Sequence, residues 1–241
     1  MVALIFRHLA TLPGALEWVW DAISPAWQSG DVQESAWRIA GSARLAPMAT
    51  ISPAALVALG VPEGGQAQIR RVVDAYNRAN PVNLMTTLCI LQLGGGNPAS
   101  RVAGKPPWQP PEIAGPIIAM GALDSLPREL NDLLASVAGP STPGGERVVQ
   151  SLYRHFLHHP AFLALVVTLL KQRMDDGSVD KAARWIHQSM LEAAAEIAST
   201  LSAPPAPHPG IESACRRFSD GIIPRMIVVG RLLDEALPKA P

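Results

Sequence analysis

The stretch from Arg70 to Leu93 constrains this fold most strongly, because it reads as one long apolar helix broken once by polar residues. Tyr76, Asn77 and Asn80 lie at positions i, i+1 and i+4, so Asn80 shares a helix face with both of the others. Pro81 follows at once, removes a backbone donor and predicts a kink. The pattern has two interpretations: a ligand pocket at the kink, or a core helix whose amides satisfy the carbonyls freed by the proline.

The rest of the chain is also patterned for helices. Apolar residues recur at helical spacing, and no alternating run with hairpin-turn chemistry predicts a strand. We expect helices at 2–12, from Pro13, at 31–45, from Pro53, at 126–137, at 147–158, from Pro160, at 178–201 and at 211–237. The sequence therefore predicts an all-α fold.

One segment interrupts the helical pattern for a long distance. The residues GGGNPASRVAGKPPWQPP at 94–111 carry glycine and proline at a density that no helix tolerates. They lack the spacing of a phosphate-binding loop. We interpret 94–111 as a linker that joins a helical repeat at 1–93 to a second one at 112–241.

Short matches between the two halves indicate a duplication. The run FRHLATLPGAL from Phe6 resembles YRHFLHHPAFL from Tyr153, at an offset of 147 residues (153 − 6). The run RRVVD from Arg70 resembles RRFSD from Arg216, at an offset of 146 (216 − 70). We expect two related helical repeats that form a pseudo-dimer. The first repeat has no counterpart of the 126–137 helix, so we expect the chain to begin inside that repeat.

Composition excludes several classes of partner. Lys plus Arg and Asp plus Glu both number 20, so charge favours neither nucleic acid nor an anionic membrane surface. No apolar run is long enough to predict a membrane span. Cys89 and Cys215 are isolated, which argues against a disulfide framework or a zinc site and fits the cytoplasm. We expect no cofactor. The hydrophobic content of 48% favours a homodimer that covers exposed apolar area.

Three stretches carry a resemblance to a known family. They are AYNRANPVNLM at 75–85 after a paired-arginine helix start, FRHLATLPGALEWVW at 6–20, and a second helix-proline-helix segment near Leu157. Together they resemble the group I 2-haloacid dehalogenases, all-helical enzymes that act on both enantiomers and are built as two related repeats. The resemblance implies a small 2-halocarboxylic acid as substrate. It also implies direct attack on carbon by a water that an aspartate activates, with no covalent intermediate.

The resemblance assigns roles to individual positions. Asn80 matches the pocket asparagine of the family, and Ser151 matches the serine that precedes the catalytic aspartate. The aspartate itself falls on Leu152, which cannot take a proton, and a pocket aromatic falls on Leu4. Two functions follow: a divergent dehalogenase that uses another base, or a non-catalytic homologue that binds small acids or serves as an interaction protein.

Two carboxylates are candidates for the missing base. Glu17 and Asp21 lie at i and i+4 on the helix after Pro13. Held together in an apolar setting, such a pair raises the pKa of one member and can shuttle a proton. The alternative is a solvated polar face of that helix.

The run HFLHHP contains His155, His158 and His159. His155 and His159 have the i, i+4 spacing that allows two imidazoles to share a metal ion, but no third ligand is evident. A histidine-rich helix end is the alternative, and we expect no metal. Ser151 with a histidine base is a further combination, although no nucleophile elbow surrounds the serine.

Overall fold

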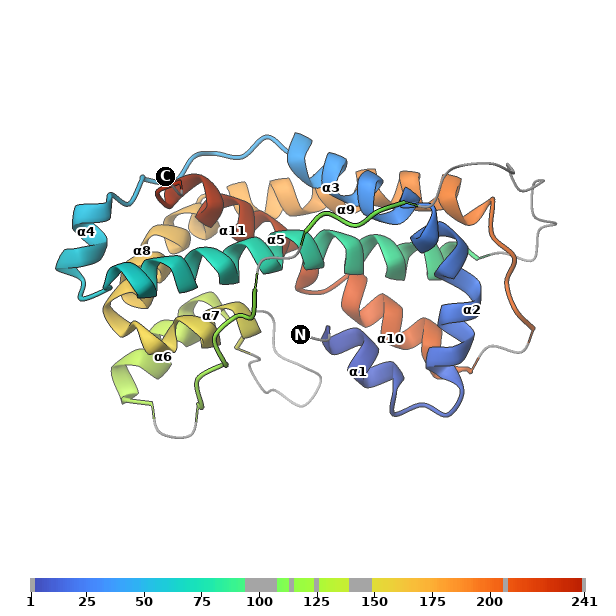
Figure 1. The fold of residues 1–241 in the computed structure, drawn as a ribbon, viewed down its shortest axis with the longest axis horizontal. Coiled ribbons are helices and arrows are strands. Elements are labelled where there is room, and N and C mark those ends of the chain that lie inside the picture. Colours follow the sequence, from blue (N-terminus) through green and yellow to red (C-terminus); the bar gives the residue numbers. More distant parts are fainter. Residues whose placement is uncertain are drawn as a thin grey trace. The chain divides into compact units, whose positions relative to one another are not determined.

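A computed structural model describes residues 3–93, 108–112, 115–123, 126–138, 149–205 and 208–239 (Figure 1). Within these ranges the chain forms helices and no strand, which confirms the predicted all-α fold for the described residues. The helices are α1 Leu4–Leu9, α2 Ala15–Gln28, α3 Asp31–Ser42, α4 Pro53–Ala58, α5 Glu63–Gln92, α6 Arg128–Val137, α7 Ser151–His155, the 3-10 helix η1 Phe156–His158, α8 Pro160–Asp175, α9 Ser178–Ala198, α10 Gly210–Ser219 and α11 Ile223–Ala236.

Proline and capping residues set several helix starts where the sequence predicts them. α4 begins at Pro53, and the Ser52 hydroxyl caps it by accepting a hydrogen bond from the amide of Ala55 at 3.1 Å. α8 begins at Pro160, whose missing amide proton is no loss at a first helical position. Both predicted starts are confirmed.

Several predicted bounds are wrong. The helix expected at 31–45 ends at Ser42, and the one expected at 147–158 is α7 from Ser151 followed by the 3-10 helix η1. The helix expected from Pro13 begins at Ala15, because Gly14 adopts a left-handed conformation with φ of 71° and forms the N-cap. The single helix expected at 211–237 is two helices, α10 and α11, which are separated after Ser219.

Helix α5 bears out the long helix predicted from Arg70 and also extends it toward the N-terminus. It runs from Glu63 to Gln92 with Pro81 inside it. The predicted kink at Pro81 stays a prediction.

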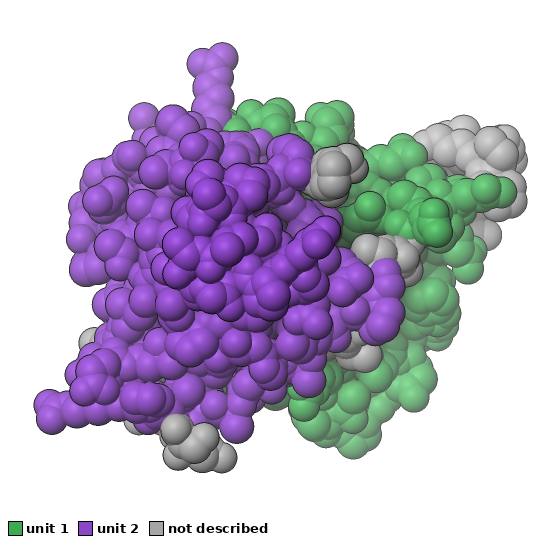
Figure 2. Space-filling model, turned by 60° about the vertical axis from the view of Figure 1, so that its left-hand side comes forward, with its two compact units in different colours: residues 1–43, 78–112, 183–224 green, residues 44–77, 113–182, 225–241 purple. Residues whose placement is uncertain are grey.

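Contacts divide the chain into two compact units, coloured separately in Figure 2. Unit 1 consists of residues 1–43, 78–112 and 183–224, and unit 2 consists of residues 44–77, 113–182 and 225–241. Each unit contains segments from both sides of the predicted linker. The two units therefore do not coincide with the predicted repeats at 1–93 and 112–241. Most of the linker, residues 94–107, lies outside the described residues, and its role stays a prediction.

Tryptophans anchor the helices of unit 1. The indole of Trp27 donates to the Thr86 hydroxyl at 3.1 Å, and that of Trp37 donates to the carbonyl of Arg78 at 2.9 Å. Trp108 packs against Trp37 with ring centroids 6.0 Å apart. These contacts join α2, α3 and the second half of α5 within one core.

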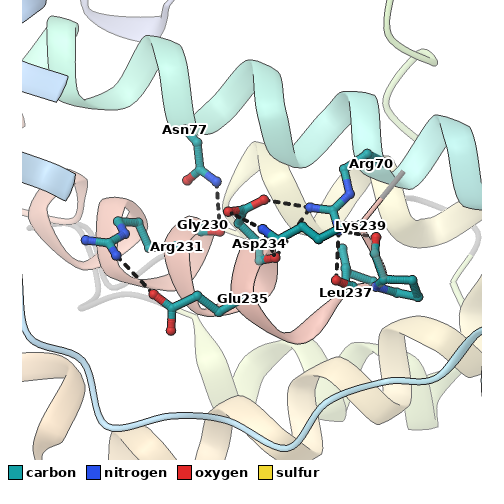
Figure 3. A network of polar contacts seen from close by, with 9 residues as sticks. Arg70, Asn77, Gly230, Arg231, Asp234, Glu235, Leu237 and Lys239 are labelled. Atoms are coloured by element: carbon teal, nitrogen blue, oxygen red, sulfur yellow. Dashed lines mark hydrogen bonds and ion pairs between the residues drawn. The ribbon is translucent and has the colours of Figure 1, made fainter. Parts of the chain in front are cut away.

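An arginine network and an aromatic core hold unit 2 together. Arg70 on α5 forms an ion pair with Asp234 at 2.6 Å, and it donates to the carbonyls of Leu237 and Pro238 beyond the end of α11 (Figure 3). The guanidinium thus ties the segment that follows α11 to the first half of α5. Phe156 and Phe162 pack edge to face at 5.2 Å in the same unit.

No helix among the described residues is both long and apolar enough to cross a membrane.

Candidate functional site

Tyr76 and Ser151 meet in unit 2. Tyr76 lies on the first half of α5 and Ser151 begins α7, and their side chains are hydrogen-bonded. Burial raises the pKa of Tyr76 to about 12, although the hydrogen bond from Ser151 and the charge of Arg154 act in the opposite direction. The phenol is therefore neutral at physiological pH. The structure brings together two of the side chains that the sequence assigns to substrate binding.

Leu152 occupies the position where the resemblance places a catalytic aspartate. Its side chain is 0% exposed and belongs to the apolar core of unit 2. A residue with no titratable group cannot activate water, so this position supplies no base. Any hydrolytic chemistry at this site needs a proton acceptor from another residue.

His155 is a titratable group on the same short helix as Leu152. It is 4% exposed, and its Nδ1 lies 2.7 Å from the carbonyl oxygen of Ile118. Because a carbonyl only accepts, Nδ1 carries the proton, and the neutral ring keeps its lone pair on Nε2. That Nε2 is buried, and no protein group among the described residues hydrogen-bonds to it. The Tyr76 ring packs against the imidazole at 5.7 Å in an edge arrangement.

The environment of His155 favours the neutral ring. Burial is the largest effect and lowers its pKa below the usual value of 6.5. The hydrogen bond to Ile118 raises the pKa, while the charges of His158 and Arg154 lower it further. The net result is an imidazole that carries no charge at neutral pH.

Neighbouring side chains fix the segment that carries Ile118. The imidazole of His158 donates from Nε2 to the carbonyl of Ala119 at 2.8 Å. Arg154 donates to the carbonyl of Gly121, and the amide of Gly121 donates back to the carbonyl of Arg154 at 2.9 Å. The residues around His155 therefore hold its carbonyl partner in place.

Tyr153 adds a second buried polar group. Its side chain is 0% exposed, and no protein group among the described residues hydrogen-bonds to its hydroxyl. Burial raises the pKa of Tyr153, and the charge of Arg225 partly offsets this effect. Arg225 itself is paired with Asp180 at 2.5 Å, so the carboxylate of Asp180 is committed to an ion pair.

Asn77 has a structural contact. Its amide donates to the carbonyl of Gly230 on α11 at 3.0 Å (Figure 3). A Cβ on Gly230 would lie 2.4 Å from the Asn77 oxygen, so the two helices approach closely here. This contact favours the core-helix interpretation for Asn77, while its predicted role in substrate binding stays a prediction.

Four predicted site residues lie in unit 1. Asn80 is 7% exposed on the second half of α5, and its predicted role in substrate binding stays a prediction. Leu4 is 64% exposed at the start of α1. Glu17 and Asp21 are both exposed on α2, which favours the solvated polar face over a pair held in an apolar setting.

The three histidines of the HFLHHP run do not share one helix face. α7 ends at His155, and a 3-10 helix at Phe156–His158 follows. The i, i+4 argument for a shared metal needs a continuous α-helix, which is absent here. Within the described ranges, no group of three potential metal ligands occurs.

The sequence could have indicated His155 as part of this site. Ser151, Leu152 and His155 are spaced i, i+1 and i+4 on α7, so His155 neighbours both of the others on one helix face. The Ile118 contact has no such signal, because it depends on a tertiary approach of an extended segment.

The fold of this chain is similar to that of known structures. No family model matches the chain, and no curated protein sequence is similar to it. One solved structure, a D-2-haloacid dehalogenase mutant in complex with D-2-CPA, has a TM-score of 0.68 at 18% identity, over 98% of this chain and 86% of that chain. A second, the D-2-haloacid dehalogenase with L-LA, has a TM-score of 0.62 at 18% identity, over 98% and 84% of the two chains. The chain therefore has the all-helical fold seen in D-2-haloacid dehalogenase structures.

Proposed function

We propose that this chain binds small 2-substituted carboxylic acids and hydrolyses the carbon–halogen bond of 2-halocarboxylic acids. Water attacks the carbon that bears the halogen, the halide leaves, and a protein base takes the proton from water. No covalent intermediate and no cofactor take part. This is the chemistry of the group I dehalogenases, which the sequence resembles.

The observation that carries the proposal is the shared fold. The likeness extends over 98% of the chain, and two of the similar structures are complexes with small molecules, D-2-CPA and L-LA. The hydrogen bond between Tyr76 and Ser151 adds local support, because it joins two predicted substrate-binding residues beside a buried histidine.

A second candidate is a non-catalytic homologue that keeps the acid-binding site. The specific observation in its favour is Leu152, a fully buried leucine where the resemblance places the base. Under this alternative the chain binds 2-halo acids and their hydroxy-acid products but converts none of them.

We also propose that the helices form two related repeats. Gly30 and Gly177 support this, because both have positive φ, 80° and 75°, and each precedes a helix. They are separated by 147 residues (177 − 30), the same offset as the matched sequence runs. Left-handed glycines at equivalent positions are expected if one helical unit was duplicated.

Chloride release and binding together separate the two candidate functions. The full chain is incubated with each enantiomer of 2-chloropropionate while chloride is measured, and calorimetry measures binding of the same acids and of lactate. Binding with chloride release supports the hydrolase. Binding without release supports the non-catalytic homologue, and absence of both contradicts both candidates.

Leu152→Asp provides a complementary test, with Leu152→Asn as the matched control. The aspartate restores a carboxylate at the family's base position, whereas asparagine has a similar shape and no basic oxygen. If the unaltered chain binds acids without converting them, we expect weak chloride release from Leu152→Asp and none from Leu152→Asn. Both changes place a polar group in a buried position, so circular dichroism must first show that each variant is folded.

A further inference from the structure

Because position 152 offers no proton acceptor, the proposed hydrolysis needs a base elsewhere in the same part of unit 2. Asp180 is held in an ion pair with Arg225. The segment 151–158 contains no acidic residue. Asp74 on α5 already takes part in an interaction of its own. The other titratable groups on or beside α7 and η1 are Tyr76, Tyr153, Arg154, His155, His158 and His159.

Four of these groups are unsuitable as bases. Tyr76 has a pKa raised to about 12, and burial also raises the pKa of Tyr153, so both are neutral phenols with little basicity at neutral pH. His158 is exposed to solvent, and its Nε2 donates to Ala119, so its other nitrogen would activate only bulk water. Arg154 is permanently charged.

His159 also has a buried Nε2 with no partner in the described part of the chain, but its ring packs against Gly65 near the start of α5. His155 lies on α7 with position 152, and its Nδ1 is fixed by the carbonyl of Ile118. His155 is therefore the best-placed base.

We propose that His155 is the general base of this site and takes the place of the aspartate that Leu152 lacks. The inference rests on the proposed hydrolase function. Nδ1–H donates to Ile118, which fixes the tautomer and the ring orientation, and Nε2 presents a buried lone pair with no protein partner among the described residues. A base must also be held in one orientation, and the Tyr76 ring against the imidazole contributes to that.

The spacing along α7 brings this base to the appropriate face. Residues three and four apart on a helix lie side by side, with Cβ atoms about 5–6 Å apart. His155 follows Leu152 by three residues and Ser151 by four. An imidazole is also longer than a carboxylate, so a base at position 155 can act on the region that a side chain at position 152 would serve.

In the proposed step, water displaces the halide directly. Nε2 accepts a proton from water, the water oxygen forms a bond to the carbon that bears the halogen, and the carbon–halogen bond breaks with its electron pair on the halide. His155 is then an imidazolium, which returns its proton to solvent. Because burial and the neighbouring charges disfavour the imidazolium, this proton loss is favourable at neutral pH.

His155→Asn is the decisive variant, because the asparagine amide can still donate to Ile118 from the position of Nδ1 while the Nε2 lone pair is lost. His8→Asn is the matched control, because it is the same substitution at an exposed histidine on α1 in unit 1, outside the proposed site. Chloride release from 2-chloropropionate gives kcat and KM for each chain. We expect His155→Asn to lower kcat about a hundredfold or more with little change in KM, and His8→Asn to keep the unaltered rate.

The pH profile of the unaltered chain is an independent readout that requires no folded variant. The base must be neutral to act, so the rate should rise with pH through an ionisation below 6.5 and then stay constant. A His155→Asn chain that is folded and keeps its kcat overturns the inference and leaves the proposed function standing. A rate with no acid limb, in protein shown to be folded at each pH, also overturns it. If the unaltered chain releases no chloride, the proposed hydrolase function fails, and the role of His155 fails with it.

Discussion

At the candidate site, the polar side chains of Tyr76 and Ser151 meet in a largely apolar environment. Tyr76 is 6% exposed, and its hydroxyl is satisfied by Ser151. A buried hydrogen bond of this kind contributes modestly to the free energy of unfolding. Removing one partner costs more, because the other polar group then stays buried without a hydrogen bond. The energetic link between α5 and α7 can therefore be measured at these two residues.

Tyr76→Phe and Ser151→Ala test that link. Each change should lower the free energy of unfolding by about 0.5–1.5 kcal/mol, and the double variant should lose less than the two single losses combined. Urea denaturation of the four chains gives the coupling energy. Strict additivity would contradict the contact between the two side chains.

At the scale of elements, local sequence predicts helices well and their partners poorly. Ser52 and Pro160 mark helix starts because caps and prolines act on the backbone within one turn. Gly14 shifts the start of α2 because its left-handed conformation is a property of the turn that precedes the helix. The contacts of Arg70 and His155 could not be predicted, because they involve residues far away in the sequence.

Gly30 and Gly177 form a matched pair for a test of element packing. Both have positive φ, so alanine is strained at each position by roughly 1–2 kcal/mol. A Cβ at Gly30 would also lie 2.3 Å from the Trp108 ring, whereas none of the described atoms lies within 4 Å of a Cβ at Gly177. Gly30→Ala should therefore destabilise the chain more than Gly177→Ala and should change tryptophan fluorescence. Equal losses with identical spectra would contradict the packing of Trp108 on Gly30.

Arg70 tests the connection between α5 and the end of α11. Arg70→Met keeps most of the apolar stem but removes the ion pair with Asp234 and the donors to Leu237 and Pro238. Hydrogen bonds that involve a charged group contribute about 1.5–3 kcal/mol each, so we expect a loss of at least about 2 kcal/mol in urea denaturation. Arg128→Ala is the control, because its pair with Asp132 is highly exposed and should contribute less than about 0.5 kcal/mol. Equal effects of the two changes would show that the network of Figure 3 carries no stability.

At the scale of the whole molecule, burial of ionisable groups sets the response to alkali. The chain has two tyrosines and two cysteines, and all four are buried. Burial raises the pKa of Tyr76, Cys89 and Cys215 to about 12 and raises that of Tyr153 as well. In an unfolded chain, cysteine ionises near pH 8.5 and tyrosine near pH 10. The folded state thus binds more protons above these values, and its stability is present below them and lost as pH rises toward the folded pKa values.

The prediction is that the free energy of unfolding falls steadily above about pH 9. Tyrosinate absorbance should stay low in the folded chain at about pH 10.5. It should rise when urea unfolds the chain, because the exposed phenols then ionise. Cys89→Ala should flatten the loss of stability between about pH 9 and 11, because it removes one of the contributing groups. Equal tyrosinate absorbance with and without urea at about pH 10.5 would contradict the burial of Tyr76 and Tyr153.

The all-helical fold and most helix starts were predictable from periodicity, caps and prolines. The two packing units were not, because unit 2 joins the first half of α5 to α7, α8 and α11 from the other side of the predicted linker. The same holds for the site: Tyr76 was identified by its place in the helix pattern and Ser151 by the family resemblance, and only the fold brings them into contact.

The central claim, hydrolysis of small 2-halocarboxylic acids, is tested most directly by chloride release from each enantiomer of 2-chloropropionate by the unaltered chain. We expect enzyme-dependent chloride release, with one lactate formed for each chloride and with inverted configuration, because water attacks the carbon directly. Folded protein that binds these acids and releases no chloride would contradict the claim and leave a binding protein with a dehalogenase fold.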